Sequence, residues 1–276
     1  MTAIRNILLP LGFLFVVFFQ AQTSPIPTIE PLLQAHAHND YEHERPLLDA
    51  LAQGFTSVEA DVHLIGKKLL VAHNARDIQA DKTLQSLYLN PLRDIIRQNR
   101  GSVFPEGSGF TLFIDIKTKG EATYQAIEDA LKEYKEILTS FPHEKTLSGA
   151  VTVIISGNRP RQTMENQNIR YAAYDGRLTD LDTNANPNFI PIISDNWKKN
   201  FSWKGDGAMP PNERAKLVEI VTKAHANKQR VRLWATPDTP SAERDAVWLE
   251  LLNAGVDLIN TDDLVGLKKF LIENDR

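Results

Sequence analysis

Short runs of β-branched and aliphatic residues recur along the chain and alternate with longer segments of helical period. This alternation is typical of repeated βα units around a parallel sheet. Eight strands are expected, at Leu33–His38, Thr56–Leu64 (with a hairpin continuation over Lys68–Asn74), Thr111–Lys117, Val151–Ser156, Arg170–Tyr174, Phe189–Ser194, Arg230–Ala235 and Leu258–Thr261. The clearest helices are expected at Pro46–Gln53, Glu121–Ser140, Asn212–Asn227 and Ser241–Asn253. Because no linker, repeat or low-complexity tract interrupts the series, the sequence predicts one α/β domain, a single (β/α)8 TIM-like barrel.

The first 23 residues have the layout of a secretory signal peptide. Arg5 precedes the apolar run from Ile7 to Phe19, and small or polar residues follow before Pro25. The run is shorter than the roughly 20 residues that a membrane-spanning helix needs. We therefore expect residues 1–23 to be cleaved, which leaves a barrel domain over residues 24–276. Such a protein would be exported, either periplasmic or secreted.

Composition excludes several classes of function. The chain has 31 Lys and Arg against 35 Asp and Glu, a formal net charge of −4, so it lacks the basic excess that nucleic-acid binding requires. Cysteine is absent, which excludes disulfides, thiolate zinc sites and a cysteine nucleophile. Neither a phosphate-cradling P-loop nor a Gly-x-Ser-x-Gly nucleophile elbow is present. Any metal must then be bound by oxygen and imidazole ligands.

Acidic side chains occupy the expected inward face of two strands. Strand alternation points Glu59 and Asp61 into the barrel, while the aliphatic residues between and beside them face the helices. Asp115 is a single carboxylate near the end of an apolar strand. Unit charges about 4 Å apart repel by about 4 kcal/mol at an effective dielectric of about 20, so three converging carboxylates call for a cation. Oxygen ligands favour Mg²⁺ or Ca²⁺. The alternative for Glu59 and Asp61 is a structural ion pair inside the barrel.

Five histidines lie early in the chain, at positions 36, 38, 43, 63 and 73. His36 and His38 share one face of the first strand, and the position of His38 at the strand end suits a catalytic group. His36 lies one layer deeper and is expected mainly to support packing. His43 and His63 are expected in loops. His73 falls in an apolar hairpin, where a buried neutral imidazole is one reading.

Several short motifs follow one another in a fixed order. They are His36-Ala37-His38-Asn39-Asp40-Tyr41, Arg45-Pro46-Leu47, Ser57-Val58-Glu59-Ala60-Asp61-Val62, Leu70-Val71-Ala72-His73-Asn74, Asp115-Ile116-Lys117, Leu233-Trp234-Ala235-Thr236 and Asn260-Thr261-Asp262. Together they resemble the phosphodiesterase superfamily that joins glycerophosphodiester phosphodiesterases, phosphatidylinositol-specific phospholipases C and sphingomyelinase D. Within it, the sequence is similar to the branch of altered inheritance of mitochondria protein six.

The resemblance implies a TIM-like barrel with one divalent cation, Mg²⁺ or Ca²⁺, on Glu59, Asp61 and Asp115. It also implies two catalytic histidines, His38 and His73. The implied activity is acid–base cleavage of a phosphodiester in a phospholipid or a glycerophosphodiester-like head group.

Two positions depart from the glycerophosphodiesterase pattern. His38-Asn39-Asp40 stands where His-Arg-Gly is expected, and Asn74 follows His73 where Asp is usual. Loss of the arginine removes a planar phosphate clamp, so other residues must supply the substrate contacts. The candidates are Asn39, Arg45, Lys117, Arg159 and Trp234.

Two other functions stay open at this point. A non-catalytic barrel that binds phosphate or lipid would account for the two departures. The His36-x-His38 pair also fits metal-dependent amidohydrolases, but that class needs further histidines after strands five and six, where the expected strands contain none.

The segment Trp197–Lys204 holds two tryptophans and three lysines. Aromatic rings and lysines of this kind can contact a membrane surface peripherally. The alternative, which we favour, is that the tryptophans pack on neighbouring helices.

Overall fold

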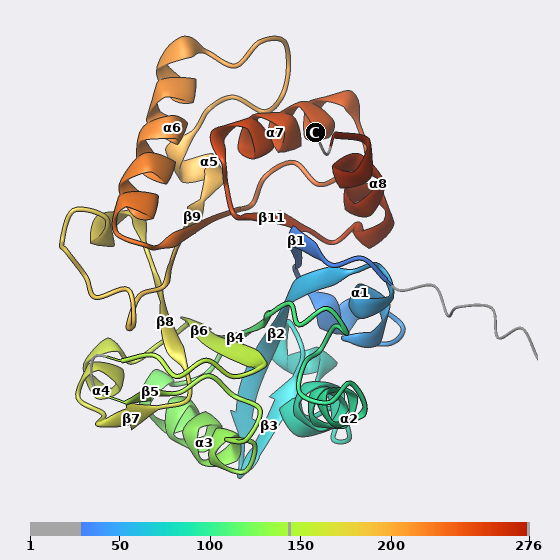
Figure 1. Cartoon of the computed structure of the whole chain (residues 1–276), viewed down its shortest axis with the longest axis vertical. Coiled ribbons are helices and arrows are strands. Elements are labelled where there is room, and N and C mark those ends of the chain that lie inside the picture. Colours follow the sequence, from blue (N-terminus) through green and yellow to red (C-terminus); the bar gives the residue numbers. More distant parts are fainter. Residues whose placement is uncertain (1–28, 143–144, 275–276) are drawn as a thin grey trace, which may run out of the picture.

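Eight strands close into a parallel barrel in the computed structural model, which describes residues 29–142 and 145–274 (Figure 1). They are β1 (Leu32–Ala37), β2 (Phe55–Ile65), β4 (Phe110–Ile116), β6 (Val151–Gly157), β8 (Ala173–Gly176), β9 (Ile192–Asn196), β10 (Arg230–Trp234) and β11 (Leu258–Thr261). Strand β1 pairs with both β11 and β2, which closes the ring, and β3 (Lys68–Val71) extends β2 as an antiparallel hairpin. The expected TIM-like barrel is confirmed. The predicted signal peptide, residues 1–23, lies outside the described residues.

Helices connect the strands and surround the barrel (Figure 1). They are α1 (Leu48–Ala52), α2 (Asn90–Gln98), α3 (Gly120–Lys132), α4 (Arg161–Glu165), α5 (Trp197–Asn200), α6 (Pro211–Ala226), α7 (Ala242–Ala254) and α8 (Leu264–Asn274). Single helical turns lie at Asp40–Glu42, Ala75–Asp77, Gln85–Leu89 and Leu178–Asp180. Among the described residues, no helix combines the length and the apolar character that a membrane span requires.

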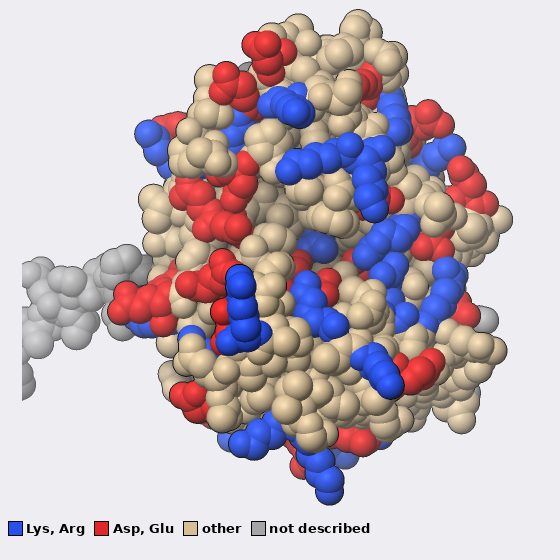
Figure 2. All heavy atoms as spheres, turned by 180° about the vertical axis from the view of Figure 1, so that it is seen from behind, with Lys and Arg blue, Asp and Glu red and all other residues tan. Residues whose placement is uncertain are grey.

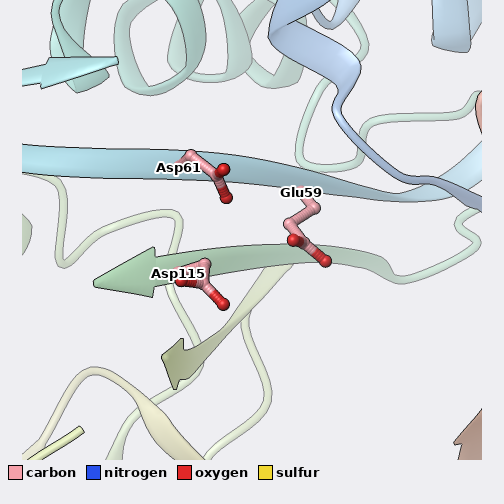
Figure 3. A group of neighbouring side chains, drawn as sticks. All are labelled: Glu59, Asp61 and Asp115. Carbon is pink, nitrogen blue, oxygen red and sulfur yellow. The ribbon is translucent and has the colours of Figure 1, made fainter. Parts of the chain in front are cut away.

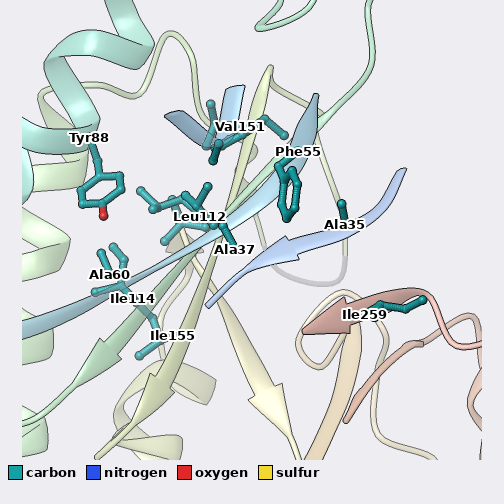
Figure 4. Close-up of a cluster of buried hydrophobic side chains, with 14 of the residues drawn as sticks. Ala35, Ala37, Phe55, Ala60, Tyr88, Leu112, Ile114, Val151, Ile155 and Ile259 are labelled. Atoms are coloured by element: carbon teal, nitrogen blue, oxygen red, sulfur yellow. The ribbon is translucent and has the colours of Figure 1, made fainter. Parts of the chain in front are cut away.

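The main core lies between the barrel wall and the helices (Figure 4). Outward-facing side chains such as Ala60, Leu112 and Ile155 are fully buried there, as strand alternation requires. A smaller apolar cluster contains Phe113, Phe141, Ile154, Ala173, Ile192 and Leu258. Several of its members alternate with the outward residues and therefore fill the barrel interior. Buried polar side chains, among them His36, Glu59 and Arg232, share the interior with these apolar residues.

The structure corrects the extent of one expected helix. Glu121–Ser140 was expected to be helical throughout, but α3 ends at Lys132. The following segment pairs with the start of β6 instead: Thr139 N–H donates to Val151 O at 2.7 Å, and Val151 N–H donates to Ile137 O at 3.0 Å. These sheet hydrogen bonds outweigh the helical propensity of the segment.

The structure also divides the strand expected over Arg170–Tyr174. Ile169–Arg170 forms β7, which pairs with β5 (Phe141–Pro142), and only Ala173–Gly176 joins the barrel as β8. Arg170 is buried, and its guanidinium lies 5.2 Å from the Phe141 ring centroid and 4.9 Å from that of Phe189. Stacking on both rings holds this cation outside the barrel wall, and the chain bends before β8.

Candidate active site

Three carboxylates meet at the carboxyl-terminal mouth of the barrel (Figure 3). Asp61 of β2 and Asp115 of β4 are register partners in neighbouring strands, and Glu59 lies two residues earlier on β2. One oxygen from each carboxylate lies within 4.8 Å of the others. Glu59 and Asp61 are buried, and Asp115 is half-buried. The structure therefore brings together the three residues that the sequence singled out as metal ligands.

Two cations share this cluster with the acids. Lys117 Nζ lies 3.0 Å from Asp61 Oδ2 and 3.0 Å from Asp115 Oδ1. Arg232 Nη1 lies 2.6 Å from Glu59 Oε2. Burial alone would raise the pKa of Glu59, but the Arg232 charge and the contact with His36 hold that pKa well below its usual range. The cluster thus holds three carboxyl groups and two basic side chains.

The remaining oxygens fit a divalent cation. Asp61 Oδ1 is buried and has no hydrogen-bond partner, which is costly for a carboxylate oxygen. Burial, followed by the charge of Glu59, raises the pKa of Asp61, so this acid in particular would gain from a further positive charge. Hard oxygen donors with residual negative charge suit Mg²⁺ or Ca²⁺. Glu59, Asp61 and Asp115 are the residues that would hold it.

His38 stands directly after β1 and is held by a residue from the last strand. Its Nδ1 lies 2.8 Å from Asp262 Oδ1, and Asp262 follows β11, the neighbour of β1. Burial would lower the pKa of His38, but the hydrogen bond to Asp262 and the charges of Glu59 and Asp262 outweigh it and raise that pKa. Because a carboxylate only accepts hydrogen bonds, Nδ1 carries the proton and Nε2 is the nitrogen left for chemistry.

His73 reaches the same cluster from the loop after β3. Its Nδ1 lies 2.9 Å from Asp61 Oδ2, and 52% of its side chain is exposed. The hydroxyl of Tyr41 donates to the same Asp61 oxygen at 2.7 Å. Asp61 therefore contacts His73, Tyr41 and Lys117 through one oxygen, while its other oxygen has no partner.

The other early histidines have structural contacts. His36 is buried between Ser57 Oγ at 2.7 Å and Arg232 Nη1 at 2.7 Å, and burial together with the Arg232 charge lowers its pKa to about 4. The expectation that His63 lies in a loop is wrong: it belongs to β2, is buried, and its Nε2 lies 3.0 Å from Ala72 O across the β2–β3 hairpin. His43 lies in the loop after the turn Asp40–Glu42, as expected.

The candidate substrate contacts lie at different distances from the carboxylates. Lys117 is within the cluster, and Asn39 donates to Asp262 Oδ2 at 3.3 Å. Arg159 is half-buried beside β8, with its guanidinium 4.6 Å from the Tyr174 ring centroid. Arg45 instead pairs with Asp49 at 2.7 Å, and 62% of its side chain is exposed. Trp234 is the last residue of β10 and is half-buried.

Two residues of the site were missed by the sequence reasoning, Arg232 and Tyr41. Arg232 contacts Glu59 and His36, and its guanidinium lies 4.4 Å from the Phe113 ring centroid. Strand alternation along Arg230–Ala235 could have indicated that Arg232 points into the barrel, since residues 230, 232 and 234 lie on the same face. Asp262 belongs to the motif Asn260-Thr261-Asp262, but nothing in the sequence indicated that it contacts His38.

The tryptophans of Trp197–Lys204 pack inside the protein. Trp197 is 1% exposed and donates from Nε1 to Trp203 O at 2.9 Å. Trp203 is 7% exposed and donates from Nε1 to Asp206 O at 2.9 Å. The lysines of the segment, at positions 198, 199 and 204, are exposed. On the face drawn in Figure 2, basic side chains gather beside a central hollow, so positive charge is offered locally despite the net −4.

Comparison with known proteins identifies the family. Residues 26–175 match the AIM6-like phosphodiesterase domain, and residues 230–264 match the glycerophosphoryl diester phosphodiesterase family. The chain belongs to the AIM6-like phosphodiesterase family. It is 33% identical to the altered inheritance of mitochondria protein 6 homolog of Arthroderma benhamiae over 264 residues, which cover 86% of this chain and 83% of that relative. The altered inheritance of mitochondria protein 6 of Saccharomyces cerevisiae is 29% identical to this chain, and the match covers 84% of this chain and 69% of that relative.

Solved structures show the same fold at low identity. The phosphatidylinositol-specific phospholipase C from Listeria monocytogenes gives a TM-score of 0.52 at 11% identity, covering 91% of this chain and 97% of its own. A glycerophosphoryl diester phosphodiesterase from Parabacteroides distasonis gives a TM-score of 0.50 at 14% identity, and the match covers 90% of this chain and 88% of that protein. The fold and the family of this AIM6-like protein are thus those of phosphodiesterases.

The two sequence departures have clear positions in this AIM6-like domain. Asp40 is fully buried and accepts hydrogen bonds from Leu47 N–H at 2.6 Å and Tyr88 O–H at 2.9 Å, so it fixes the loop between β1 and α1. Asn39 adopts a left-handed conformation with φ 47°, which Asn tolerates better than most residues. Asn74 is exposed and donates to Asp77. Neither departure removes a group from the carboxylate cluster.

Proposed function

We propose that this AIM6-like protein is a metal-dependent phosphodiesterase that cleaves a phosphodiester in a phospholipid or a glycerophosphodiester-like head group. The main support is that two imidazoles, each held at Nδ1 by a carboxylate, lie at the barrel mouth that carries three convergent carboxylates. A buried cation-binding cluster with histidines on either side provides both the charge and the proton transfers that diester cleavage needs.

In the proposed reaction, His38 and His73 move protons through Nε2. Asp262 and Asp61 accept from Nδ1–H of the two rings, which leaves an Nε2 lone pair on a neutral ring and an Nε2 proton on a charged one. One imidazole accepts the proton of the attacking hydroxyl, and the other donates a proton to the leaving oxygen. The attacker is either water or a neighbouring hydroxyl of the substrate, in which case a cyclic phosphate forms.

Positive side chains would hold the phosphate. Burial alone would lower the pKa of Lys117, but the charges of Asp115 and Asp61 raise it, so the ammonium group stays charged beside the acids. Arg159 donates from Nη1 to Gly157 O at 3.0 Å but forms no ion pair with any described residue, so its remaining N–H groups could bind a phosphate oxygen. Glu59, Asp61 and Asp115 would hold a divalent cation, which would supply charge that neutralises the phosphate.

A lipid substrate would bring the protein to a membrane surface. The exposed lysines 198, 199 and 204 could each add about 1 kcal/mol of attraction to anionic head groups. With Trp197 and Trp203 buried, peripheral contact through Trp197–Lys204 would rest on charge rather than on aromatic insertion. We further propose that the protein is exported and acts in the periplasm or outside the cell.

Phosphorus NMR of the products from a panel of phosphodiesters tests this function. We expect cleavage in the presence of Mg²⁺ or Ca²⁺, and a fall in kcat of about 10²–10⁴-fold in each of His38→Ala and His73→Ala. His43→Ala is the matched control and should keep the activity of the unmodified protein, since His43 lies in the loop after the turn Asp40–Glu42 and is not part of the carboxylate cluster. Absence of cleavage of every diester would favour the non-catalytic binding barrel. Unchanged turnover in both histidine variants would show that other groups move the protons.

A further inference from the structure

A cavity of about 620 Å³ opens at the end of the barrel opposite the candidate active site. Its lining includes Gln34, Thr56, Thr111, Thr152 and Arg230, which lie at the amino-terminal ends of their strands. His38, Asp61 and Asp115 lie at the other ends. Phe113, Ile154 and Leu258 pack in the barrel interior between this cavity and the level of Asp61 and Asp115, and Glu59 and Arg232 lie in the same layer. The cavity is therefore separate from the carboxylate cluster, and its volume suits a small ligand.

Arg230 places a cation without an ion pair in this cavity. Alternation along β10 directs Arg230 and Arg232 to the same side, but only Arg232 has carboxylate partners, Glu59 and Asp175. Arg230 donates from Nη2 to Thr111 Oγ1 at 3.2 Å, across the barrel, and it forms no ion pair with any described residue. Asp257 also lines the cavity, but its Oδ2 already accepts from Val231 N–H at 2.8 Å and contacts His225 Nε2 at 2.8 Å.

Arg230 is half-buried, and this burial, which the charge of Asp257 only partly offsets, lowers the pKa of its guanidinium. The rest of the lining supplies hydrogen-bonding groups without further charge: hydroxyls of Thr111, Thr146 and Ser148 and the backbone at Gly109 and Gly149. A guanidinium fork surrounded by hydroxyls and main-chain groups is the donor set that binds phosphate, sulfate or carboxylate oxygens.

We propose that the cavity at the amino-terminal end of the barrel is a binding site for a small oxyanion, held by Arg230 and the surrounding hydroxyls. The ligand would add negative charge beside Arg230, which feels the charge of Asp257 but forms no ion pair with any described residue. The site is independent of the proposed phosphodiesterase activity, since it shares no residue with the catalytic cluster.

The test is an NMR titration of the full chain, labelled with ¹⁵N, with inorganic phosphate, sulfate and acetate at low ionic strength. We expect saturable shifts of the amides of Gly109, Thr111 and Gly149, and an affinity at least tenfold weaker in Arg230→Met. Arg97→Met removes a comparable cation from the surface of α2 and should leave the affinity unchanged, since 65% of the Arg97 side chain is exposed. Stronger binding of phosphate and sulfate than of acetate would assign a tetrahedral oxyanion, and the reverse order a carboxylate.

A second variant keeps the test decisive if Arg230→Met fails to fold. Thr152 is the register partner of Thr111, whose hydroxyl contacts Arg230, so Thr152→Glu introduces a carboxylate close to the guanidinium. That variant should fold and lose oxyanion binding, whereas Thr152→Gln should keep it. Asp61→Asn should also keep it, which separates this site from the catalytic one. If no anion shifts the three amides, or if Thr152→Glu binds anions as well as the unmodified protein does, the proposal is wrong.

Discussion

The ion pair between Glu59 and Arg232 joins β2 to β10 across the barrel, and its loss should be costly. Only 6% of the Glu59 side chain and 4% of the Arg232 side chain are exposed, and the two charged groups lie 2.6 Å apart. Removing one partner of a buried pair while the other stays charged costs about 3–5 kcal/mol. We expect Arg232→Met and Glu59→Gln each to lower the free energy of unfolding by that amount. Arg232→Met should be the worse, because Arg232 also contacts His36 and Phe113.

Urea unfolding followed by tryptophan fluorescence, in chelator, measures these free energies. The double variant should be about as unstable as the worse single one, because neither charge is then left without a partner; the coupling energy is then about 3 kcal/mol. Arg97→Met is the exposed control and should cost less than about 1 kcal/mol, since its nearest acid, Glu136, is 3.9 Å away. Additive losses in the double variant would refute the reasoning, because they would mean that Glu59 and Arg232 contribute independently.

Two further predictions concern pH. Burial raises the pKa of Asp40 to about 7, well above the value of about 3.9 for an unfolded chain, so the native state retains a proton that the unfolded state has lost. The free energy of unfolding should therefore fall by up to about 1.4 kcal/mol per pH unit as pH rises from about 4 to 7. Urea unfolding at several pH values measures this slope, and Asp40→Asn should lack the part of the slope that Asp40 causes. Parallel slopes in the two proteins would contradict the prediction. Asp262 raises the pKa of His38, so Asp262→Asn should move the limb of the kcat/KM profile that reports His38 to lower pH, while the same substitution at the exposed Asp77 should leave the profile in place. An unshifted profile in Asp262→Asn would show that His38 does not control either limb.

Much of the site followed from local periodicity. Alternation along β2 was enough to direct Glu59 and Asp61 inward, because a period of two holds wherever a strand is regular, and Asp115 stood out as a single carboxylate near the end of an apolar strand. The barrel itself followed from the recurrence of strand and helix patterns. Placing the three carboxylates together required in addition only that β2 and β4 be neighbours in register, as they are.

The contacts that the sequence did not reveal depend on closure of the barrel. Arg232 is 173 positions from Glu59, and Asp262 is 224 positions from His38, so no local pattern connects either pair. The short interval Ile169–Gly176 was also misjudged, because the partner of β7 is β5 rather than a barrel strand. Tertiary pairing decides such cases against local propensity.

The central claim is that Glu59, Asp61 and Asp115 hold a divalent cation on which turnover depends. The most direct measurement is the rate of cleavage of a soluble glycerophosphodiester, first after exhaustive chelation and then after stepwise addition of Mg²⁺ or Ca²⁺, in the unmodified protein and in Asp61→Asn. We expect that chelation abolishes turnover, that the metal restores it with saturation, and that Asp61→Asn stays nearly inactive at every metal concentration. Full turnover in excess chelator would contradict this claim and would assign the neutralising role to Lys117 and Arg232 alone.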